Sequence, residues 1–304
     1  MQDPNCQNIR IGTLVHAEKA AETIESILPH GFESFQITFG GHIGEIDLNV
    51  LADRVREVLA KANQHAIISA VGIYGNPLTD AQTAEDWKRI IDAAESFGTD
   101  LVGGFTGRIP NRPVPDSLEA FQACFAPLAS QAEDRGVRIA FENCDMQGDW
   151  ERGDWNIAHC PRAWEMMFDA VTSNALGLEW EPCHQMVSFV DPLPQLKQWI
   201  DRVYHIHGKD AQIEWDVVRA QGTRSGLPFV AHRTPGFGET DWTRLIGILR
   251  QHCYQGSIDI EGWHDPVYCD HWEMTGQVHA LGYLKQCRGG DFVPNPDASC
   301  SNSS

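Results

Sequence analysis

Basic residues are scarce in this sequence. Its 304 residues contain 23 Lys and Arg against 42 Asp and Glu, which gives a formal net charge of −19. Binding to a nucleic-acid backbone or to an anionic membrane requires a basic surface. The charge therefore argues against both kinds of partner, and we expect a small molecule as the ligand.

The sequence also lacks the features of membrane and secreted proteins. Its most apolar stretches, such as residues 66–74, are far shorter than the ~20 residues that span a bilayer. The first residues contain neither the basic nor the apolar part of a secretory signal. The nine cysteines are odd in number and include no Cys-x-x-Cys pair, so they do not indicate a disulfide framework. We expect a cytoplasmic protein with reduced thiols.

Short apolar runs that favour strands alternate with amphipathic segments along most of the chain. Eight such runs span Ile9–Val15, Ser34–Phe39, Ala66–Ile73, Leu101–Phe105, Arg138–Glu142, Leu176–Glu181, Val203–Ile206 and Ser257–Glu261. Helical spacing is found over Leu48–Gln64, Ala81–Phe97, Leu118–Arg135, Pro161–Thr172, Pro192–Asp201 and Trp242–His252. This alternation predicts right-handed βαβ units and a parallel sheet.

Eight units are the number that closes a (β/α)8 TIM barrel. A doubly wound open sheet is the alternative, but no glycine-rich phosphate-binding fingerprint follows the first predicted strand. We predict a single barrel domain over residues 1–288 and a flexible C-terminal tail over residues 289–304. The connection over residues 208–241 is too long for a simple turn, which predicts a functional loop.

Four consecutive predicted strands end in a glutamate or a histidine. These residues are Glu142, Glu181, His207 and Glu261. TIM-barrel active sites form at the C-terminal ends of the strands, where three carboxylates would repel one another without a cation between them. The four residues therefore predict a divalent metal site. Mn²⁺ is the ion we expect, although Mg²⁺, Co²⁺ and Zn²⁺ also suit these ligands.

A second polar layer is predicted directly beneath this site. Because side chains alternate along a strand, the residues two positions before three of the ligands share their face. These are Glu179, His205 and Asp259, in a place that Val, Ile or Leu normally fill. They predict either a network that orients the metal ligands or a hydrogen-bonded core cluster without a role in catalysis.

Several motifs carry a resemblance to a known family. They are Phe141-Glu142-Asn143, Glu181-Pro182-Cys183-His184, Asp191-Pro192, the segments 201–210 and 233–242, and Ile260-Glu261. Together they resemble the xylose isomerase-like barrels, specifically the sugar phosphate isomerase/epimerase group that includes ketose 3-epimerases. The resemblance extends from about residue 8 to residue 287.

The resemblance implies a role for each matching residue. It makes Glu142, Glu181, His207 and Glu261 the metal ligands, and it gives Glu142 and Glu261 the transfer of the substrate proton. It also places His184 and Arg233 on substrate oxygens. Two positions depart from the family pattern. Glu181 replaces an aspartate, and Gly208-Lys209-Asp210 replaces Gly-Glu.

Two further residues are candidates on other grounds. Lys209 follows the ligand strand that carries His207 and can return a proton to the substrate, so we treat it as catalytic. Arg108 follows an earlier strand and is a candidate for binding substrate hydroxyls.

These residues predict a sugar isomerase or epimerase that acts through an enediolate. An alternative is a metal-dependent lyase, hydratase or deglycosidase that acts on keto-sugars by elimination. Lys209 and the long 208–241 connection favour this alternative, and in such enzymes a small partner subunit can complete the site. A remote alternative is an apurinic (AP) endonuclease, which requires further histidines after the second and third strands. A catalytically inactive binding protein is a fourth reading. We expect an unphosphorylated sugar as substrate and a homo-oligomer.

Overall fold

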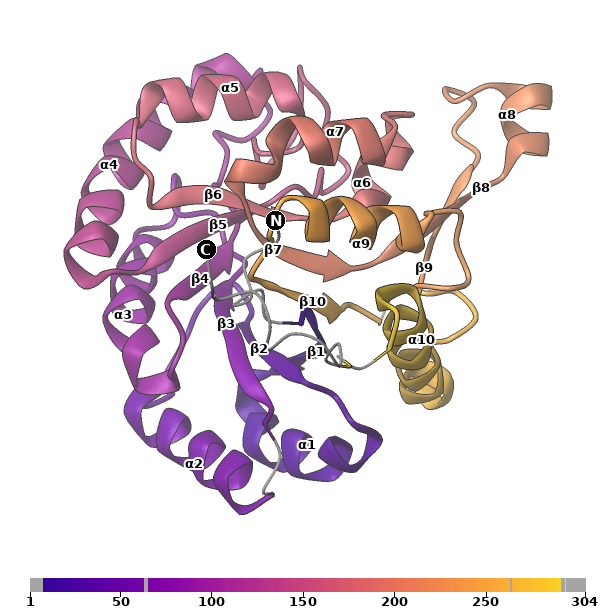
Figure 1. The fold of residues 1–304 in the computed structure, drawn as a ribbon. Helices are drawn as coiled ribbons and strands as arrows, with labels where there is room; N and C mark the ends of the chain where they lie inside the picture. The colour runs from indigo at the N-terminus through magenta and orange to yellow at the C-terminus, as the bar shows by residue number, and fades with distance from the viewer. Residues whose placement is uncertain (1–7, 63–64, 263, 291–292, 294–304) are drawn as a thin grey trace, which may run out of the picture.

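The computed structural model describes residues 8–62, 65–262, 264–290 and 293. Eight parallel strands form a closed barrel in the spatial order β1-β10-β7-β6-β5-β4-β3-β2 (Figure 1). They are β1 (Arg10–His16), β2 (Ser34–Phe39), β3 (Ile67–Ile73), β4 (Leu101–Gly104), β5 (Arg138–Glu142), β6 (Leu176–Trp180), β7 (Val203–Gly208) and β10 (Ser257–Ile260). Each coincides with a predicted strand to within a few residues, so the (β/α)8 TIM barrel is confirmed.

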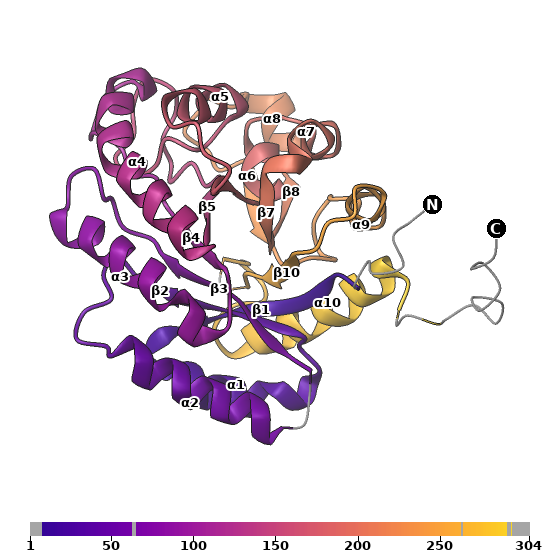
Figure 2. The ribbon, with the colours of Figure 1, turned by 60° about the vertical axis from the view of Figure 1, so that its left-hand side comes forward.

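Helices cover the outside of the barrel (Figure 2). They are α1 (Ala20–Ile27), α2 (Leu48–Lys61), α3 (Ala81–Phe97), α4 (Leu118–Arg135), α5 (Pro161–Ala170), α6 (Pro182–Val187), α7 (Pro192–Trp199), α9 (Trp242–Gln251) and α10 (Glu273–Arg288). Each of the six segments with predicted helical spacing contains a helix, and residues 63–64 of the first segment lie outside the described residues. The helices α1, α6 and α10 were not among these predictions.

Local sequence signals explain where several helices begin. The side chains of Asp47, Asp80, Asp191 and Asp241 accept hydrogen bonds from backbone N–H groups in the first turns of α2, α3, α7 and α9. These bonds satisfy donors that have no partner within the helix. Proline occupies the first helical position of α5, α6 and α7, where its missing N–H costs nothing.

The apolar core lies between the barrel strands and the surrounding helices. Trp87 on α3, Phe121 and Phe125 on α4, and Phe141 on β5 are all fully buried. The ring of Phe125 packs edge-on against Trp87 and Phe141, with ring centroids 5.5 and 4.9 Å apart. This packing holds the outward face of β5 against two helices and leaves Glu142 at the strand end facing inward.

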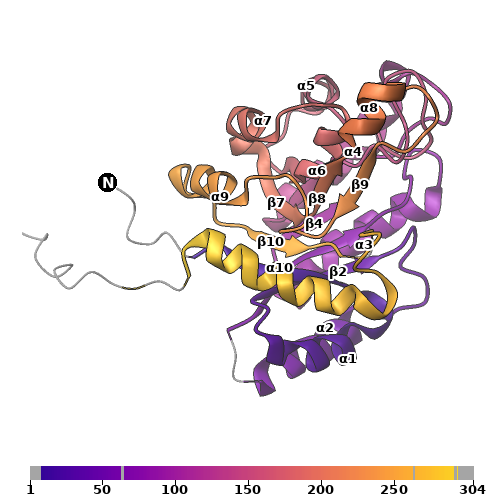
Figure 3. The ribbon, with the colours of Figure 1, turned by 90° about the vertical axis from the view of Figure 1, so that its right-hand side faces the viewer.

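The predicted functional loop contains structure of its own. Strands β8 (Asp210–Ile213) and β9 (Val230–Arg233) form an antiparallel pair, and α8 (Trp215–Gln221) lies between them. This hairpin projects from the barrel (Figures 1 and 3). The buried Asp210 carboxylate anchors the following segment, because it accepts hydrogen bonds from the Thr240 N–H and from Trp242 Nε1.

The last helix, α10, ends at Arg288, and the domain boundary at residue 288 stays a prediction. Most of the predicted tail over residues 289–304 lies outside the described residues. No helix in the described part of the chain has the length and apolarity needed to cross a membrane.

Candidate metal centre and active site

The four predicted metal ligands converge at the C-terminal mouth of the barrel. Glu142 ends β5, Glu181 follows β6, His207 lies near the end of β7, and Glu261 follows β10. One potential ligand atom from each of the four residues lies within 4.8 Å of the others, and all four side chains are buried. The barrel therefore brings together residues that are spread over 120 positions of sequence.

Several of these atoms have no hydrogen-bond partner in the described part of the chain. They include Glu181 Oε1, His207 Nδ1 and Glu261 Oε2. A buried polar atom without a partner is unfavourable, and three carboxylates with one imidazole are a suitable ligand set for a divalent cation. The residues present therefore fit a metal ion, although metal binding itself remains a prediction.

Lys209 balances part of the negative charge. Its Nζ lies 2.9 Å from Glu261 Oε1 and 3.9 Å from Glu181 Oε2, and its side chain is almost fully buried. Burial alone would lower the pKa of Lys209, but the carboxylates of Glu181 and Glu261 together raise this pKa well above its usual value. Lys209 is therefore an ammonium ion within the site.

The carboxylates of the site do not titrate alike. Burial, reinforced by the neighbouring Glu181 carboxylate, raises the pKa of Glu142 well above its usual value. Burial also acts to raise the pKa of Glu261, but Lys209 and the His207 and His264 side chains outweigh it and hold this pKa well below its usual value. The ammonium group of Lys209 thus stabilises the charge of Glu261, whereas the charge of Glu142 is repelled by the neighbouring carboxylates, Glu181 foremost.

The second polar layer exists as predicted. His205 places Nδ1 2.9 Å from Glu179 Oε1 and Nε2 2.7 Å from Asp259 Oδ2. Burial lowers the pKa of His205, but the hydrogen bonds to Asp259 and Glu179 outweigh it and raise the pKa above the usual value. Ser34 and Ser69 donate their hydroxyl groups to Asp259. The interior of the barrel therefore contains a hydrogen-bonded polar triad, Glu179, His205 and Asp259, in place of an apolar layer.

Two glycines on other strands of the barrel leave room for this triad. A side chain at Gly103 on β4 would place its Cβ 2.5 Å from Glu179 Oε1. A side chain at Gly12 on β1 would place its Cβ 2.2 Å from Asp259 Oδ1. Both distances are too short for a non-bonded contact. β4 and β1 therefore require glycine at the positions that face the Glu179 and Asp259 side chains in the barrel interior.

A cavity of about 460 Å³ opens above the four predicted ligands. Glu142, His207 and Glu261 line it together with Lys209 and His184. Its remaining lining residues are Leu14, His16, Thr38, Phe39, Gly40, Tyr74, Phe105, Cys144, Asp145, Met146, Gln147, His232 and His264. The cavity is large enough for a monosaccharide or a cyclic polyol and joins polar groups to the aromatic rings of Tyr74 and Phe105.

His232 on β9 is a residue of the site that the sequence analysis missed. Its ring lies 4.8 Å from the ring of His184, and its Nδ1 has no hydrogen-bond partner among the described residues. Burial, with Lys209 nearby, lowers the pKa of His232 to about 4, and burial also lowers the pKa of His184. Both rings are neutral and can bind hydroxyl or carbonyl groups. The only sequence signal for His232 was its place beside Arg233.

Arg233 follows the cavity-lining His232 on β9 and is held by other residues. Its Nε donates to Asp265 Oδ2 at 3.0 Å, and its Nη1 donates to Gln212 Oε1 at 2.7 Å. It is not among the described residues that line the cavity. Its contact with a substrate therefore stays a prediction.

The structure does not bring Arg108 to the cavity. Its buried guanidinium donates to the carbonyl oxygens of Arg112, Asp149 and Trp150 at distances from 2.7 to 3.3 Å. These bonds hold together two loops, 108–112 and 149–150. The donors of the guanidinium are thus occupied by the main chain, and the expected contact with substrate hydroxyls stays a prediction.

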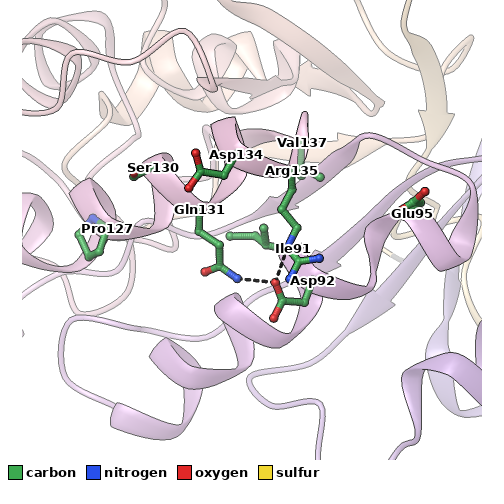
Figure 4. A pocket seen from close by; sticks show the side chains of 9 residues that line it. All are labelled: Ile91, Asp92, Glu95, Pro127, Ser130, Gln131, Asp134, Arg135 and Val137. Atoms are coloured by element: carbon green, nitrogen blue, oxygen red, sulfur yellow. Dashed lines mark hydrogen bonds and ion pairs between the residues drawn. The ribbon is translucent and has the colours of Figure 1, made fainter.

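A surface hollow of about 840 Å³ lies elsewhere, on the outside of the barrel between α3 and α4 (Figure 4). There Asp92 accepts a hydrogen bond from Gln131 and forms an ion pair with Arg135. The polar groups in this hollow thus bind one another, and it contains none of the predicted ligands. We assign the functional site to the mouth of the barrel.

The described lining does not contain the additional histidines of an endonuclease. After β2 and β3 the cavity is lined by Gly40 and Tyr74. His42 instead pairs with Asp80 at 2.5 Å on the surface. This arrangement, with the acidic charge, favours a sugar-modifying site over a DNA-cleaving one.

Comparison with known proteins agrees with this geometry. The sequence profile of the xylose isomerase-like TIM barrel family matches residues 24–287. The chain belongs to this family. Inosose dehydratases of Clostridium perfringens (strain ATCC 13124) and Clostridium tetani (strain Massachusetts / E88) are 29% identical over 129 residues and 34% identical over 114 residues. The matched segments cover 40% and 36% of this chain, and 41% and 37% of those relatives.

Solved structures share the fold of this family member. The 3-keto-D-glucoside 4-epimerase YcjR of E. coli superimposes with a TM-score of 0.67 at 17% identity, covering 92% of this chain and 100% of that one. A D-tagatose 3-epimerase-like protein gives a TM-score of 0.68 at 16% identity, with 92% and 97% covered. Named relatives and neighbours thus include both dehydratases and epimerases of sugars.

Proposed function

We propose that this protein is a divalent-metal-dependent lyase that dehydrates an unphosphorylated keto-sugar or keto-cyclitol through an enediolate. The observation that carries the proposal is the place of Lys209. Its ammonium group lines the cavity and contacts Glu261, so a proton donor stands beside the predicted ligands. The matched inosose dehydratases support a dehydration in preference to other outcomes.

The first step is the removal of a proton from the carbon next to the substrate carbonyl. Glu142 and Glu261 both line the cavity, and either carboxylate can act as the general base. When bound to these residues, a divalent cation would polarise the carbonyl and stabilise the negative charge of the enediolate. Glu142, Glu181, His207 and Glu261 would hold it.

The second step is the loss of a hydroxyl group from the neighbouring carbon. The electron pair of the enediolate forms a carbon–carbon double bond, the C–O bond breaks, and Lys209 gives its proton to the departing oxygen. The products are one water molecule and an unsaturated ketone or its diketone tautomer. The glutamate that took the first proton and the neutral Lys209 return to their starting states by one proton transfer.

The charge of the cavity favours a neutral substrate. Among the described lining residues, Lys209 is the one Lys or Arg, and it is already paired with Glu261. His184 and His232 are neutral, because burial lowers the pKa of each. A phosphate group would therefore meet acidic side chains without a cluster of basic groups to bind it, whereas hydroxyl groups find imidazole, amide and phenol partners.

The test is turnover of a substrate panel in D₂O by Mn²⁺-loaded protein. The panel contains an inosose, a 3-keto-glucoside and D-fructose, each with its phosphorylated counterpart where one exists. We expect dehydration of an unphosphorylated member, seen as the absorbance of a conjugated ketone. Lys209→Met should abolish dehydration and keep exchange of the C–H hydrogen for deuterium. Lys197→Met, at an exposed position on α7, serves as the control and should keep both.

Two results would overturn this assignment. Dehydration at an unchanged rate by Lys209→Met would remove Lys209 from the reaction. Turnover in which every carbon keeps its own hydrogen would point to hydride transfer and exclude the enediolate.

Epimerisation is the second candidate, because the cavity holds two carboxylates, Glu142 and Glu261, that could serve opposite faces of one carbon. In the same experiment an epimerase would give a stereoisomer labelled with deuterium and no loss of water.

The homo-oligomer and the small partner subunit of a deglycosidase remain predictions. Analytical ultracentrifugation of the purified chain would measure the oligomeric state.

A further inference from the structure

The two nitrogen atoms of His207 have different surroundings. Nε2 lies 2.8 Å from Gln36 Oε1, and 3.3 Å from Glu179 Oε1. Nδ1 faces the predicted metal ligands, 3.4 Å from Glu261 Oε2, and has no hydrogen-bond partner among the described residues. One side of the ring thus faces two acceptors in the barrel interior, and the other side faces the cation site.

The orientation of the Gln36 amide is determined by its own neighbours. Its Nε2 donates to Glu179 Oε1 at 2.6 Å and to the Tyr74 hydroxyl at 2.8 Å. The Tyr74 hydroxyl in turn donates to Glu179 Oε2 at 2.8 Å. A carboxylate only accepts hydrogen bonds, so the NH₂ group of Gln36 must face Glu179. The amide oxygen is therefore left facing His207.

We propose that Gln36 on β2 is a positioning residue that selects the tautomer of His207 through which the metal is bound. The Gln36 oxygen accepts a hydrogen bond, so His207 Nε2 must carry the proton. His207 Nδ1 then presents its lone pair to the cation. A metal-bound histidine needs this kind of partner on its other nitrogen. The inference rests on the metal site of the proposed function and adds a residue that no predicted ligand set contains.

The packing around Gln36 leaves this arrangement little freedom. Gln36 is fully buried, and a side chain at Gly72 on the adjacent β3 would place its Cβ 3.1 Å from Gln36 Nε2 and 2.9 Å from the Tyr74 ring. Glu179 is itself held by His205 from β7. Four strands, β2, β3, β6 and β7, therefore contribute to the orientation of one imidazole ring.

The variant that tests this role is Gln36→Met, which keeps the length of the side chain and removes both the acceptor and the donors. The matched control is Gln195→Met on α7. Gln195 is also buried and also both accepts a hydrogen bond, from Trp180 Nε1, and donates one, to Gln185 Oε1. It lies outside the barrel and does not touch His207, so it reproduces the loss of buried hydrogen bonds alone.

Two measurements on the full chain report on the proposal. Titration of metal-free protein with Mn²⁺, followed by calorimetry, gives the Kd, and we expect Gln36→Met to raise it by about 10- to 100-fold and Gln195→Met to leave it unchanged. Imidazole ¹⁵N NMR of the metal-free protein is recorded at a pH above the pKa of His207, which the surrounding carboxylates, Glu179 foremost, raise well above its usual value against the effect of burial. There the neutral ring, assigned by its loss in His207→Gln, should carry its proton on Nε2 in the wild type. In Gln36→Met this signal should change to a mixture of tautomers.

The outcomes separate this inference from the proposed function. If wild-type protein binds Mn²⁺ and Gln36→Met binds it equally well, or if its His207 keeps a single Nε2–H tautomer, Gln36 has no positioning role. If wild-type protein fails to bind Mn²⁺, the metal site and the tautomer's role in it fail together. An equal loss of affinity in Gln195→Met would reduce the effect to general destabilisation and also overturn the proposal.

Discussion

Replacing Glu142 with glutamine should stabilise the metal-free protein and abolish its stabilisation by metal. Glu142 lies in a buried cluster with Glu181 and Glu261, and one potential ligand atom from each residue lies within 4.8 Å of the others. Without a cation, the charge of Glu142 is opposed by these neighbours and by burial. Glutamine has nearly the same shape and no charge, so it removes the repulsion and keeps the packing.

The size of the effect follows from the distance. Two unit charges no more than 4.8 Å apart interact by at least about 3.5 kcal/mol at an effective dielectric constant of about 20. His207 and Lys209 offset part of this repulsion. We therefore expect the free energy of unfolding of metal-free Glu142→Gln to exceed that of the wild type by about 1–3 kcal/mol at pH 8.

The pH dependence gives a second signature. Burial and Glu181 raise the folded-state pKa of Glu142 well above the usual 4.5, so above pH 4.5 the folded protein binds a proton that the unfolded chain has released. Stability then falls as the pH rises from about 4.5 toward the folded-state pKa. The advantage of Glu142→Gln should consequently disappear as the pH approaches 4.5 and grow above it.

The assay is equilibrium urea unfolding of EDTA-treated protein at several pH values, repeated with saturating Mn²⁺. A metal present at 100 times its Kd should stabilise the wild type by about 2.7 kcal/mol and Glu142→Gln by much less, so the order of stability reverses. The matched variant is Glu179→Gln. Glu179 accepts hydrogen bonds from His205, Gln36 and Tyr74, so the same chemical change there should destabilise the metal-free protein.

Two results would refute this reasoning. One is a metal-free Glu142→Gln that is less stable than the wild type by an equal amount at every pH. The other is Mn²⁺ stabilisation of the variant as large as that of the wild type. Either would show that Glu142 is not an unpaired charge in a cation site.

Three further predictions concern residues around the site. Arg108→Met should lower the free energy of unfolding by about 2–3 kcal/mol, because three main-chain carbonyl groups lose a charged donor whose own side chain is buried; the Kd for Mn²⁺ should stay unchanged, and a large rise in that Kd would place Arg108 in the site. Asp210→Ala should lower the free energy of unfolding by about 2–4 kcal/mol, because it removes the acceptor of the Thr240 N–H and of Trp242 Nε1. Urea unfolding followed by tryptophan fluorescence measures this change, and no loss of stability would show that the carboxylate does not anchor the segment. Gly103→Ala should disturb Glu179 and weaken Mn²⁺ binding, whereas Gly247→Ala on α9, where a Cβ has open space, should not; equal effects would contradict the steric argument.

The barrel could be predicted from the sequence because its signals are local. Each strand is a short apolar run, and six of the helices show a 3.6-residue apolar spacing, often with an aspartate or proline at the start. The four predicted ligands could be found for the same reason. Strand ends are visible in the sequence, and the parallel topology places all of them at one mouth.

Other parts of the site depend on contacts that leave no local trace. His232 and Arg233 are neighbours in the sequence, yet only His232 lines the cavity, because adjacent side chains on β9 point to opposite sides. Arg108 follows a strand, as a substrate-binding residue would, but two loops fold around its guanidinium and occupy its donors.

By itself, the sequence determined the eight-stranded barrel, the set of acidic and imidazole groups at its mouth and the polar layer beneath them, since periodicity and strand ends are properties of neighbouring residues. The tertiary structure decided how those groups are paired. These pairings depend on the stagger and curvature of strands that are far apart in the chain. They include the contact of Lys209 with Glu261, the contact of Gln36 with His207 and the space that Gly103 leaves for Glu179. Barrel closure sets these relations, because it determines which residues of different strands share a level in the interior.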